Sequence, residues 1–168
     1  ALLQHVLHTA GQLQARSAVV ITGHGATEVE AALPGGTVAG AGFDLKFVRQ
    51  EPQLGTGHAV QQAVPALAGD GMAVVLSGDV PLTQADTLQD LLRAAGNDKM
   101  ALLTVAMPDP TGYGRIVRND AGTVQRIVEQ KDANDAERAI TEIYSGIMAV
   151  PVKHLTQWLA RLNNNNAQ

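Results

Sequence analysis

The chain reads Ala-Val-Val-Leu-Ser-Gly-Asp-Val-Pro-Leu from Ala73 to Leu82, and this stretch decides the fold class. Its first four residues form a short apolar run, which is typical of a strand buried on both faces of a parallel α/β sheet. Glycine and proline then end the run and leave one carboxylate, Asp79, beyond the strand. Ligands of open α/β sheets bind outside the carboxyl ends of the strands, so Asp79 is a candidate contact for a metal or a phosphate. The alternative is that Asp79 lies in a Gly-Asp turn and caps a helix that starts near Thr83.

Strands and helices are expected to alternate along the first two thirds of the chain. Apolar runs predict strands at 18–22, 45–49, 73–76 and 102–105, and helical patterns occur near 2–13, 27–33, 58–64 and 85–95. This order predicts a Rossmann-like α/β fold, with a mainly parallel sheet flanked by helices.

From Pro108 onward the pattern changes. Strands are predicted at 116–118 and 124–128, and the Asn-Asp-Ala-Gly turn between them is typical of a hairpin or meander. A longer strand at 143–150 and a helix at 152–162 follow. The second half is therefore expected to be a β-rich insertion that covers one side of the sheet.

Composition limits the number of domains and the class of partner. A chain of 168 residues with 45% hydrophobic residues is long enough for one domain with one sizeable core. Its net charge of -4, with 12 Lys and Arg spread along the chain, gives no basic stripe for nucleic acid. No apolar run approaches the roughly 20 residues of a membrane span. The absence of cysteine fits a cytoplasmic protein.

Both ends of the sequence are expected to be incomplete. Ala1 lies directly inside an amphipathic helical pattern, and a helix that opens an α/β chain usually follows a strand. The other end, Asn163 to Gln168, is polar. We therefore expect further sequence before Ala1 and after Gln168.

The loop at 50–59, Gln-Glu-Pro-Gln-Leu-Gly-Thr-Gly-His-Ala, lies between a predicted strand and helix at the same edge of the sheet as Asp79. Gly55 and Gly57 allow a ligand to approach the backbone, and the helix start offers unpaired N–H groups. Gln50 carries the donor and acceptor that would read the imide edge of a uracil. The alternative is an ordinary turn, and the loop matches neither a Walker nor a Rossmann glycine motif.

A second glycine loop, Pro-Thr-Gly-Tyr-Gly-Arg at 110–115, follows another strand. Gly112 and Gly114 could offer backbone N–H groups to a sugar, whereas Arg115 is expected to be a solvated surface charge rather than a phosphate ligand. Glu129 ends a strand and could accept hydrogen bonds from sugar hydroxyls, although a solvated charged face is the alternative.

The remaining polar residues give no sign of a metal centre or a covalent nucleophile. His5 and His8 are expected on a helix surface, and His24 and His58 are assigned hydrogen-bonding roles. Trp158 is expected in the core. No Ser, His and Asp arrangement indicates a nucleophile.

These motifs together resemble those of one family. They occur in the same order and extend over nearly the whole chain. They are Gln50 with the loop to Ala59, Gly-Asp-Val-Pro-Leu at 78–82, Asp-Pro-Thr-Gly-Tyr-Gly-Arg at 109–115, Val-Glu-Gln-Lys-Asp at 128–132 and Asn-Asn-Asn-Ala-Gln at 164–168. The family is the bacterial bifunctional N-acetylglucosamine-1-phosphate uridylyltransferase and glucosamine-1-phosphate acetyltransferase. The chain is similar to the N-terminal uridylyltransferase domain of that family. The resemblance implies that residues 1–168 form a single domain that is truncated at both ends.

The resemblance implies a reaction and a cofactor. UTP and N-acetylglucosamine-1-phosphate would give UDP-N-acetylglucosamine, a precursor of peptidoglycan and lipopolysaccharide, and pyrophosphate. By the same resemblance, Gln50 and the backbone of Gly55 would recognise uracil, with Thr56 beside them. Gly78 and Asp79 would contact substrate, and Asp79 would be the catalytic ligand of Mg²⁺.

For the sugar, the resemblance implies that the backbone of Gly114 and the side chain of Glu129 hold the N-acetylglucosamine moiety. The family commonly has Asn followed by Thr-Gly where this chain has Tyr144-Ser145-Gly146. If that Asn bonds the sugar in the family, Tyr144 would do so through its hydroxyl or leave the contact to another group.

The resemblance also implies parts that lie outside this sequence. The glycine-rich loop that holds the triphosphate would precede Ala1, and a second metal-binding Asn would follow Gln168. The left-handed β-helix acetyltransferase domain, through which the full-length family forms homotrimers, is absent from residues 1–168. The chain alone is therefore expected to turn over little or nothing.

Three other functions remain to be weighed against this one. The chain could be a non-catalytic UDP-sugar-binding module, or a nucleotidyltransferase for another sugar phosphate. A nicotinamide-dependent dehydrogenase is disfavoured because the glycine fingerprint is lacking.

Overall fold

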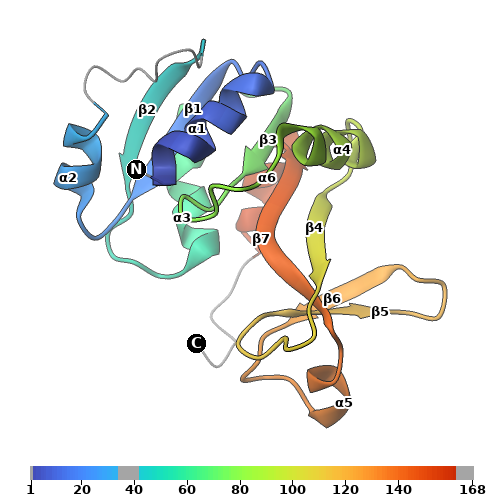
Figure 1. The fold of residues 1–168 in the computed structure, drawn as a ribbon. Helices are drawn as coiled ribbons and strands as arrows, with labels where there is room; N and C mark the ends of the chain where they lie inside the picture. The colour runs from blue at the N-terminus through green and yellow to red at the C-terminus, as the bar shows by residue number, and fades with distance from the viewer. Residues whose placement is uncertain (1, 34–41, 162–168) are drawn as a thin grey trace. The chain divides into compact units, whose positions relative to one another are not determined.

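The structure is a computed structural model that describes residues 2–33 and 42–161. These residues form two compact units. The first contains the described residues up to Ala101 together with those from Ala149 onward, and the second is Leu102–Met148. Figure 1 draws both, coloured from blue at the N-terminus to red at the C-terminus.

The first unit is an α/β structure. Strands β1 (Ser17–Thr22) and β2 (Asp44–Arg49) pair in parallel, and β3 (Met72–Val75) pairs with β7 (Glu142–Pro151), whose last residues belong to this unit. Its helices are α1 (Leu2–Gln12), α2 (Ala26–Ala31), α3 (Thr56–Ala63), the 3-10 turn η2 (Val64–Ala66), α4 (Ala85–Ala95) and α6 (Val152–Leu159). The mixed α/β fold expected from the alternating pattern is confirmed.

Helical periodicity explains why these segments form helices. In α4 the buried residues are Leu88, Leu91 and Ala95, at intervals of three and four, which places them on one face. The helix ends at Gly96, whose φ of 58° favours glycine and whose N–H donates to the carbonyl of Leu92. None of the helices within residues 2–33 and 42–161 is long and apolar enough to cross a bilayer.

The core of the first unit contains two apolar clusters. One consists of Leu7, Val20 and Leu33, with Leu3 and Ala18 packed against it. The other consists of Val60, Val150 and Leu155, and it takes in Ala73, Val75 and the ring of Trp158, as expected for a core tryptophan. In Figure 1, α1 lies in front of β1. Because Ala18 and Val20 are two apart, they share the face of β1 that meets α1.

The second unit is β-rich, as expected. It contains most of β4 (Ala101–Ala106), β5 (Arg115–Arg118), β6 (Val124–Val128), the short helix α5 (Asp135–Arg138) and β7 up to Met148. Strands β5 and β6 are antiparallel, β5 also pairs with β7, and β4 pairs with β7.

The predicted hairpin is confirmed at the turn between β5 and β6. Gly122 N–H donates to the Asn119 carbonyl at 2.8 Å, and Thr123 N–H donates to Asn119 Oδ1 at 2.8 Å. Gly122 has a φ of 77°, which is the backbone freedom that the turn requires.

Candidate functional site

Asp79 lies in a tight turn after β3. The turn is closed by a hydrogen bond from Val80 N–H to the Ser77 carbonyl at 3.3 Å, and Gly78 and Asp79 occupy its centre. Asp79 is exposed, and its carboxylate has no hydrogen-bond or ion-pair partner among the described residues. The alternative that Asp79 caps the next helix is wrong, because the N-cap of α4 is Gln84 and no side chain caps it.

The lone carboxylate of Asp79 is compatible with one way in which proteins bind magnesium. Within the described ranges no group of three His, Asp or Glu residues could hold a metal, so a closed protein cage is not formed there. Mg²⁺ is usually held by one or two carboxylates, with waters and substrate phosphates completing its coordination. A single exposed carboxylate at a strand end is compatible with that mode of binding.

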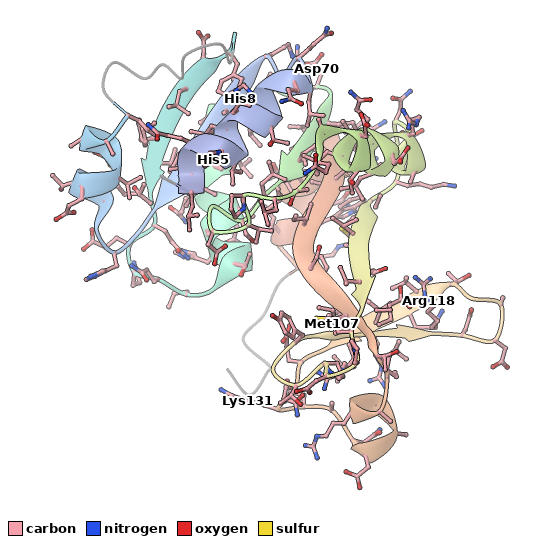
Figure 2. The ribbon with its side chains drawn as sticks, viewed as in Figure 1. His5, His8, Asp70, Met107, Arg118 and Lys131 are labelled. Carbon is pink, nitrogen blue, oxygen red and sulfur yellow. The ribbon has the colours of Figure 1, made fainter. Side chains whose placement is uncertain are left out.

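The histidines do not contribute to such a site. His5 and His8 lie on α1, where both side chains are exposed, as predicted (Figure 2). His58 has the hydrogen-bonding role expected of it. Its Nδ1 lies 3.1 Å from Gln50 Nε2, and its Nε2 lies 3.1 Å from Gln62 Nε2.

The loop at 50–55 is held in shape by Gln50. The backbone N–H of Gln50 donates to the Thr22 carbonyl at 2.7 Å, which continues the pairing of β2 with β1 beyond Arg49. Its side-chain Nε2 donates to the Gly55 carbonyl at 2.9 Å. The Oε1 atom of Gln50 has no partner in the described part of the chain and remains free to accept a hydrogen bond.

Gly55 links this loop to α3. It is the N-cap residue, and its φ of 92° with ψ of 176° is a conformation that is essentially confined to glycine. No side chain caps the helix, so its first N–H groups point outward without an intrahelical partner. Thr56, the first residue of α3, is exposed beside them.

In the second unit, Gly114, Glu129 and Tyr144 form one cluster. Tyr144 N–H donates to the Gly114 carbonyl at 2.9 Å. A Cβ atom built on Gly114 would lie 2.9 Å from Ile127 Cγ2 and 3.2 Å from Glu129 Oε1. The Glu129 carboxylate therefore lies against the backbone of Gly114, and this close approach requires glycine. Glu129 is half-buried, and its carboxylate has no partner within the described ranges.

The side chain of Tyr144 carries a buried hydroxyl. This group has no hydrogen-bond partner in the part of the chain that the structure describes. Burial raises the pKa of Tyr144 to about 12, because removal from water disfavours the phenolate. The hydroxyl is therefore neutral at physiological pH and can both donate and accept a hydrogen bond.

Arg115 corrects the sequence-based expectation, because it is buried rather than a solvated surface charge. It is only 1% exposed, and its Nη2 donates to Gln130 Oε1 at 2.6 Å, while its Nη1 donates to the Tyr113 carbonyl. Gly112 N–H donates to the same Gln130 oxygen at 3.3 Å. Arg115 and Gln130 thus anchor the glycine loop. Gln130 was not singled out from the sequence; its place directly after Glu129 was the available signal.

The predicted site residues therefore lie in three local groups. Gln50, Gly55 and Thr56 share the loop before α3, and Gly78 with Asp79 forms the turn after β3; both groups belong to the first unit. Gly114, Glu129 and Tyr144 belong to the second unit. The Asn-Asn-Asn-Ala-Gln motif at 164–168 lies outside the described residues.

The loops and the fold match a class of nucleotide-transferring proteins. The chain belongs to the family of MobA-like NTP transferase domains, whose profile matches residues 1–163. This membership shows the nucleotidyltransferase class that the sequence predicts.

More specific similarity comes from curated relatives. The chain is 73% identical over 167 residues to the bifunctional protein GlmU of Acidovorax sp. (strain JS42), and 70% identical over 168 residues to that of Albidiferax ferrireducens. The expected resemblance to the bifunctional family is thereby confirmed. The matches cover 99% and 100% of this chain, but it spans only 35% and 36% of these relatives.

A solved structure supports the fold. A putative glucose-1-phosphate thymidylyltransferase from Bacillus anthracis, crystallised with sucrose, superposes with a TM-score of 0.72. The match covers 96% of this chain and 63% of that one. Since the identity is 16%, the similarity establishes a common fold only.

Proposed function

We propose that this chain forms part of a uridylyltransferase that makes UDP-N-acetylglucosamine from UTP and N-acetylglucosamine-1-phosphate. The observation that carries the proposal is the similarity to bifunctional GlmU, which extends over 99% of the chain and includes all three groups of site residues. Membership of the NTP transferase family supports the reaction class.

The proposed reaction is an in-line displacement. A phosphate oxygen of the sugar-1-phosphate attacks the α-phosphorus of UTP, the bond to the bridging oxygen of the β-phosphate breaks, and pyrophosphate leaves. This needs placement of two anionic substrates and no side-chain nucleophile. Asp79 would hold the magnesium ion, which neutralises phosphate charge when bound.

The Gln50 loop has the groups that uracil needs. Gln50 Nε2 already donates to the Gly55 carbonyl, which leaves Oε1 to accept from the N3–H of the uracil imide. The Gly55 N–H would donate to a uracil carbonyl, and Thr56 would lie beside the ring. The existing hydrogen bond fixes the amide before the nucleotide arrives, so less conformational entropy is lost on binding.

The second cluster has the groups that a sugar needs. The Glu129 carboxylate would accept hydrogen bonds from sugar hydroxyls, and the backbone of Gly114 would contact the N-acetyl side of the ring. The buried hydroxyl of Tyr144, which lacks a partner among the described residues, would supply a further hydrogen bond to the sugar, at the position where the family commonly has an Asn.

The proposal also covers the whole protein. UDP-N-acetylglucosamine would serve peptidoglycan and lipopolysaccharide synthesis in the cytoplasm. The remaining length of the relatives would include the acetyltransferase domain, through which the protein would assemble into trimers.

Pyrophosphate release tests the proposal, measured on the chain together with the flanking sequence that its longer relatives have. With UTP, N-acetylglucosamine-1-phosphate and magnesium, Asp79→Asn should lower kcat/KM at least about a hundredfold, because a metal-held charge contributes several kcal/mol. The matched control is Asp86→Asn, an exposed carboxylate in the first turn of α4, which should leave the rate unchanged. Binding of UDP-N-acetylglucosamine without release of pyrophosphate would instead support the non-catalytic binding module.

A further inference from the structure

His58 connects the loop before α3 to the body of that helix. Gln50 directly follows β2, His58 lies in the first turn of α3, and Gln62 lies one turn further along the helix (Figure 1). Positions 58 and 62 are four residues apart and therefore share one face of α3. The imidazole contacts one amide with each ring nitrogen. Its Nδ1 is 3.1 Å from Gln50 Nε2, and its Nε2 is 3.1 Å from Gln62 Nε2.

The two amides constrain the position of the ring proton. A neutral imidazole has one N–H and one nitrogen that accepts, so one amide must direct its nitrogen at the ring and the other its oxygen. A side-chain amide can turn by about 180° with little change of shape, which exchanges its nitrogen and its oxygen. Two arrangements meet this condition, and they differ in the atom that Gln50 directs at His58.

Gly55 selects between these arrangements. Its carbonyl accepts from Gln50 Nε2 at 2.9 Å and from the backbone N–H of Ala59 at 3.0 Å. A turned Gln50 amide would place its oxygen against this carbonyl oxygen, where two acceptors repel. Turning Gln62 instead loses only the long contact between its Nε2 and the His58 carbonyl, at 3.4 Å. Gln50 therefore keeps its nitrogen directed at His58 Nδ1, and the ring proton lies on Nε2.

This arrangement determines which atom of Gln50 is offered to a ligand. It uses both hydrogens of Gln50 Nε2, one on the Gly55 carbonyl and one on His58 Nδ1. Oε1 is then the polar atom of the amide that has no partner in the described part of the chain. The amide cannot turn over without losing two hydrogen bonds, so it presents an acceptor rather than a donor.

We propose that His58 is a positioning residue for base recognition, whose Nε2–H tautomer holds the Gln50 amide with its oxygen toward the nucleotide. An oxygen in this place binds a base with an N–H there, as the uracil imide has at N3. Cytosine has an acceptor nitrogen at N3, which would face the oxygen and be rejected. A turned amide would reverse this preference. The inference rests on the proposed uridylyl transfer and adds the residue that sets the choice between UTP and CTP.

Paired substitutions of His58 test the inference in the pyrophosphate release assay, on the chain with its flanking sequence. In His58→Asn, the amide oxygen can take the place of Nδ1, because both atoms are bonded to Cγ. Leucine has nearly the shape of asparagine, but His58→Leu puts a methyl group in that place. The ratio of kcat/KM for UTP to that for CTP should fall about three- to tenfold in His58→Leu, the preference lost with one hydrogen bond, and stay within about twofold of the parent in His58→Asn. A change in stability alone would lower both values of kcat/KM and leave their ratio unchanged.

NMR of the chain itself tests the tautomer without any turnover. At a pH where the ring is neutral, correlations between the ring nitrogens and the carbon-bound ring protons should show hydrogen on Nε2 and none on Nδ1. The signals of His58 are assigned as those that are missing from the spectrum of His58→Asn.

Failure of this inference is distinguishable from failure of the proposed function. A proton on Nδ1, or an unchanged ratio in His58→Leu when the parent prefers UTP, would overturn the inference and leave the proposed function standing. A ratio that falls equally in both variants would reduce His58 to a packing role and also overturn it. A parent that releases no pyrophosphate, or that uses UTP and CTP equally, would overturn the proposed function and with it the choice of base assigned to His58.

Discussion

Replacing Tyr144 by phenylalanine should stabilise the chain while weakening sugar binding. The hydroxyl is buried without a partner among the described residues, and such a group costs about 1–3 kcal/mol relative to an apolar one of the same shape. Phenylalanine keeps the ring and removes the unpaired oxygen. We expect a gain of about 1 kcal/mol, which for a chain of this size is a rise in Tm of about 2–4 °C.

Thermal unfolding followed by circular dichroism measures this change. The control is Tyr113→Phe, because Tyr113 is 46% exposed. The Tm of this variant should stay within about 1 °C of the parent. A fall in Tm for Tyr144→Phe would refute the reasoning, since it would show that the hydroxyl has a stabilising partner in the folded chain.

Tyr144→Phe should also change sugar binding, measured on the chain together with its flanking sequence. If the hydroxyl contacts the sugar, Tyr144→Phe should weaken N-acetylglucosamine-1-phosphate binding about five- to tenfold, the loss of one hydrogen bond. Calorimetric titration measures the change. Unchanged affinity would remove Tyr144 from the proposed sugar site without affecting the stability argument.

The raised pKa of Tyr144 gives a pH dependence with a definite sign. Burial raises it to about 12, whereas an unfolded tyrosine titrates near 10. Below about pH 10 both states hold the proton and stability is unaffected. As pH rises from about 10 to 12, the unfolded state loses its proton first, so the free energy of unfolding falls; Tyr144→Phe should lack this contribution in urea titrations.

Three further predictions concern stability and local order. Gly55→Ala should lower Tm by several degrees, because φ of 92° costs a side chain about 1–3 kcal/mol; Gly69→Ala, which has open space and no such φ, is the control. Arg115→Met should speed amide exchange in the glycine loop about tenfold, because that loop loses its anchor; unchanged exchange would contradict this role. Arg118 lowers the pKa of Glu142 through paired hydrogen bonds at 2.6 and 2.8 Å. The ionised pair therefore contributes to the free energy of unfolding above about pH 4.5, and this contribution is lost as the pH falls through the lowered pKa of Glu142. Acid unfolding of Arg118→Met should therefore be less steep than that of the parent.

The sequence was most informative where structure is local. Apolar runs and helical periodicity predicted every major strand and helix. Burial of one or both faces of a strand or helix determines the spacing of its apolar residues, and this spacing can be recognised in the sequence. The short helix α5 was missed because four residues are too few for a periodicity, although Asn134 and Glu137 form the capping box that could have revealed it.

Contacts between distant positions could not be predicted in this way. The burial of Arg115 depends on Gln130 and the Tyr113 carbonyl, and no pattern near Arg115 shows those partners. The pairing of β3 with β7 likewise depends on which strands become neighbours. The role of Asp79 as a helix cap was a reasonable local alternative, and it fails because the chain continues through Gln84 before α4 begins.

The proposed function is tested most directly by comparing nucleotides in the pyrophosphate release assay, using the chain with its flanking sequence. Gln50 Oε1 is free to accept from the uracil imide, and cytosine has no N3–H to donate. With N-acetylglucosamine-1-phosphate as the second substrate, kcat/KM for UTP should exceed that for CTP at least about a hundredfold. Equal use of UTP and CTP, or faster turnover with glucose-1-phosphate than with N-acetylglucosamine-1-phosphate, would contradict the assignment.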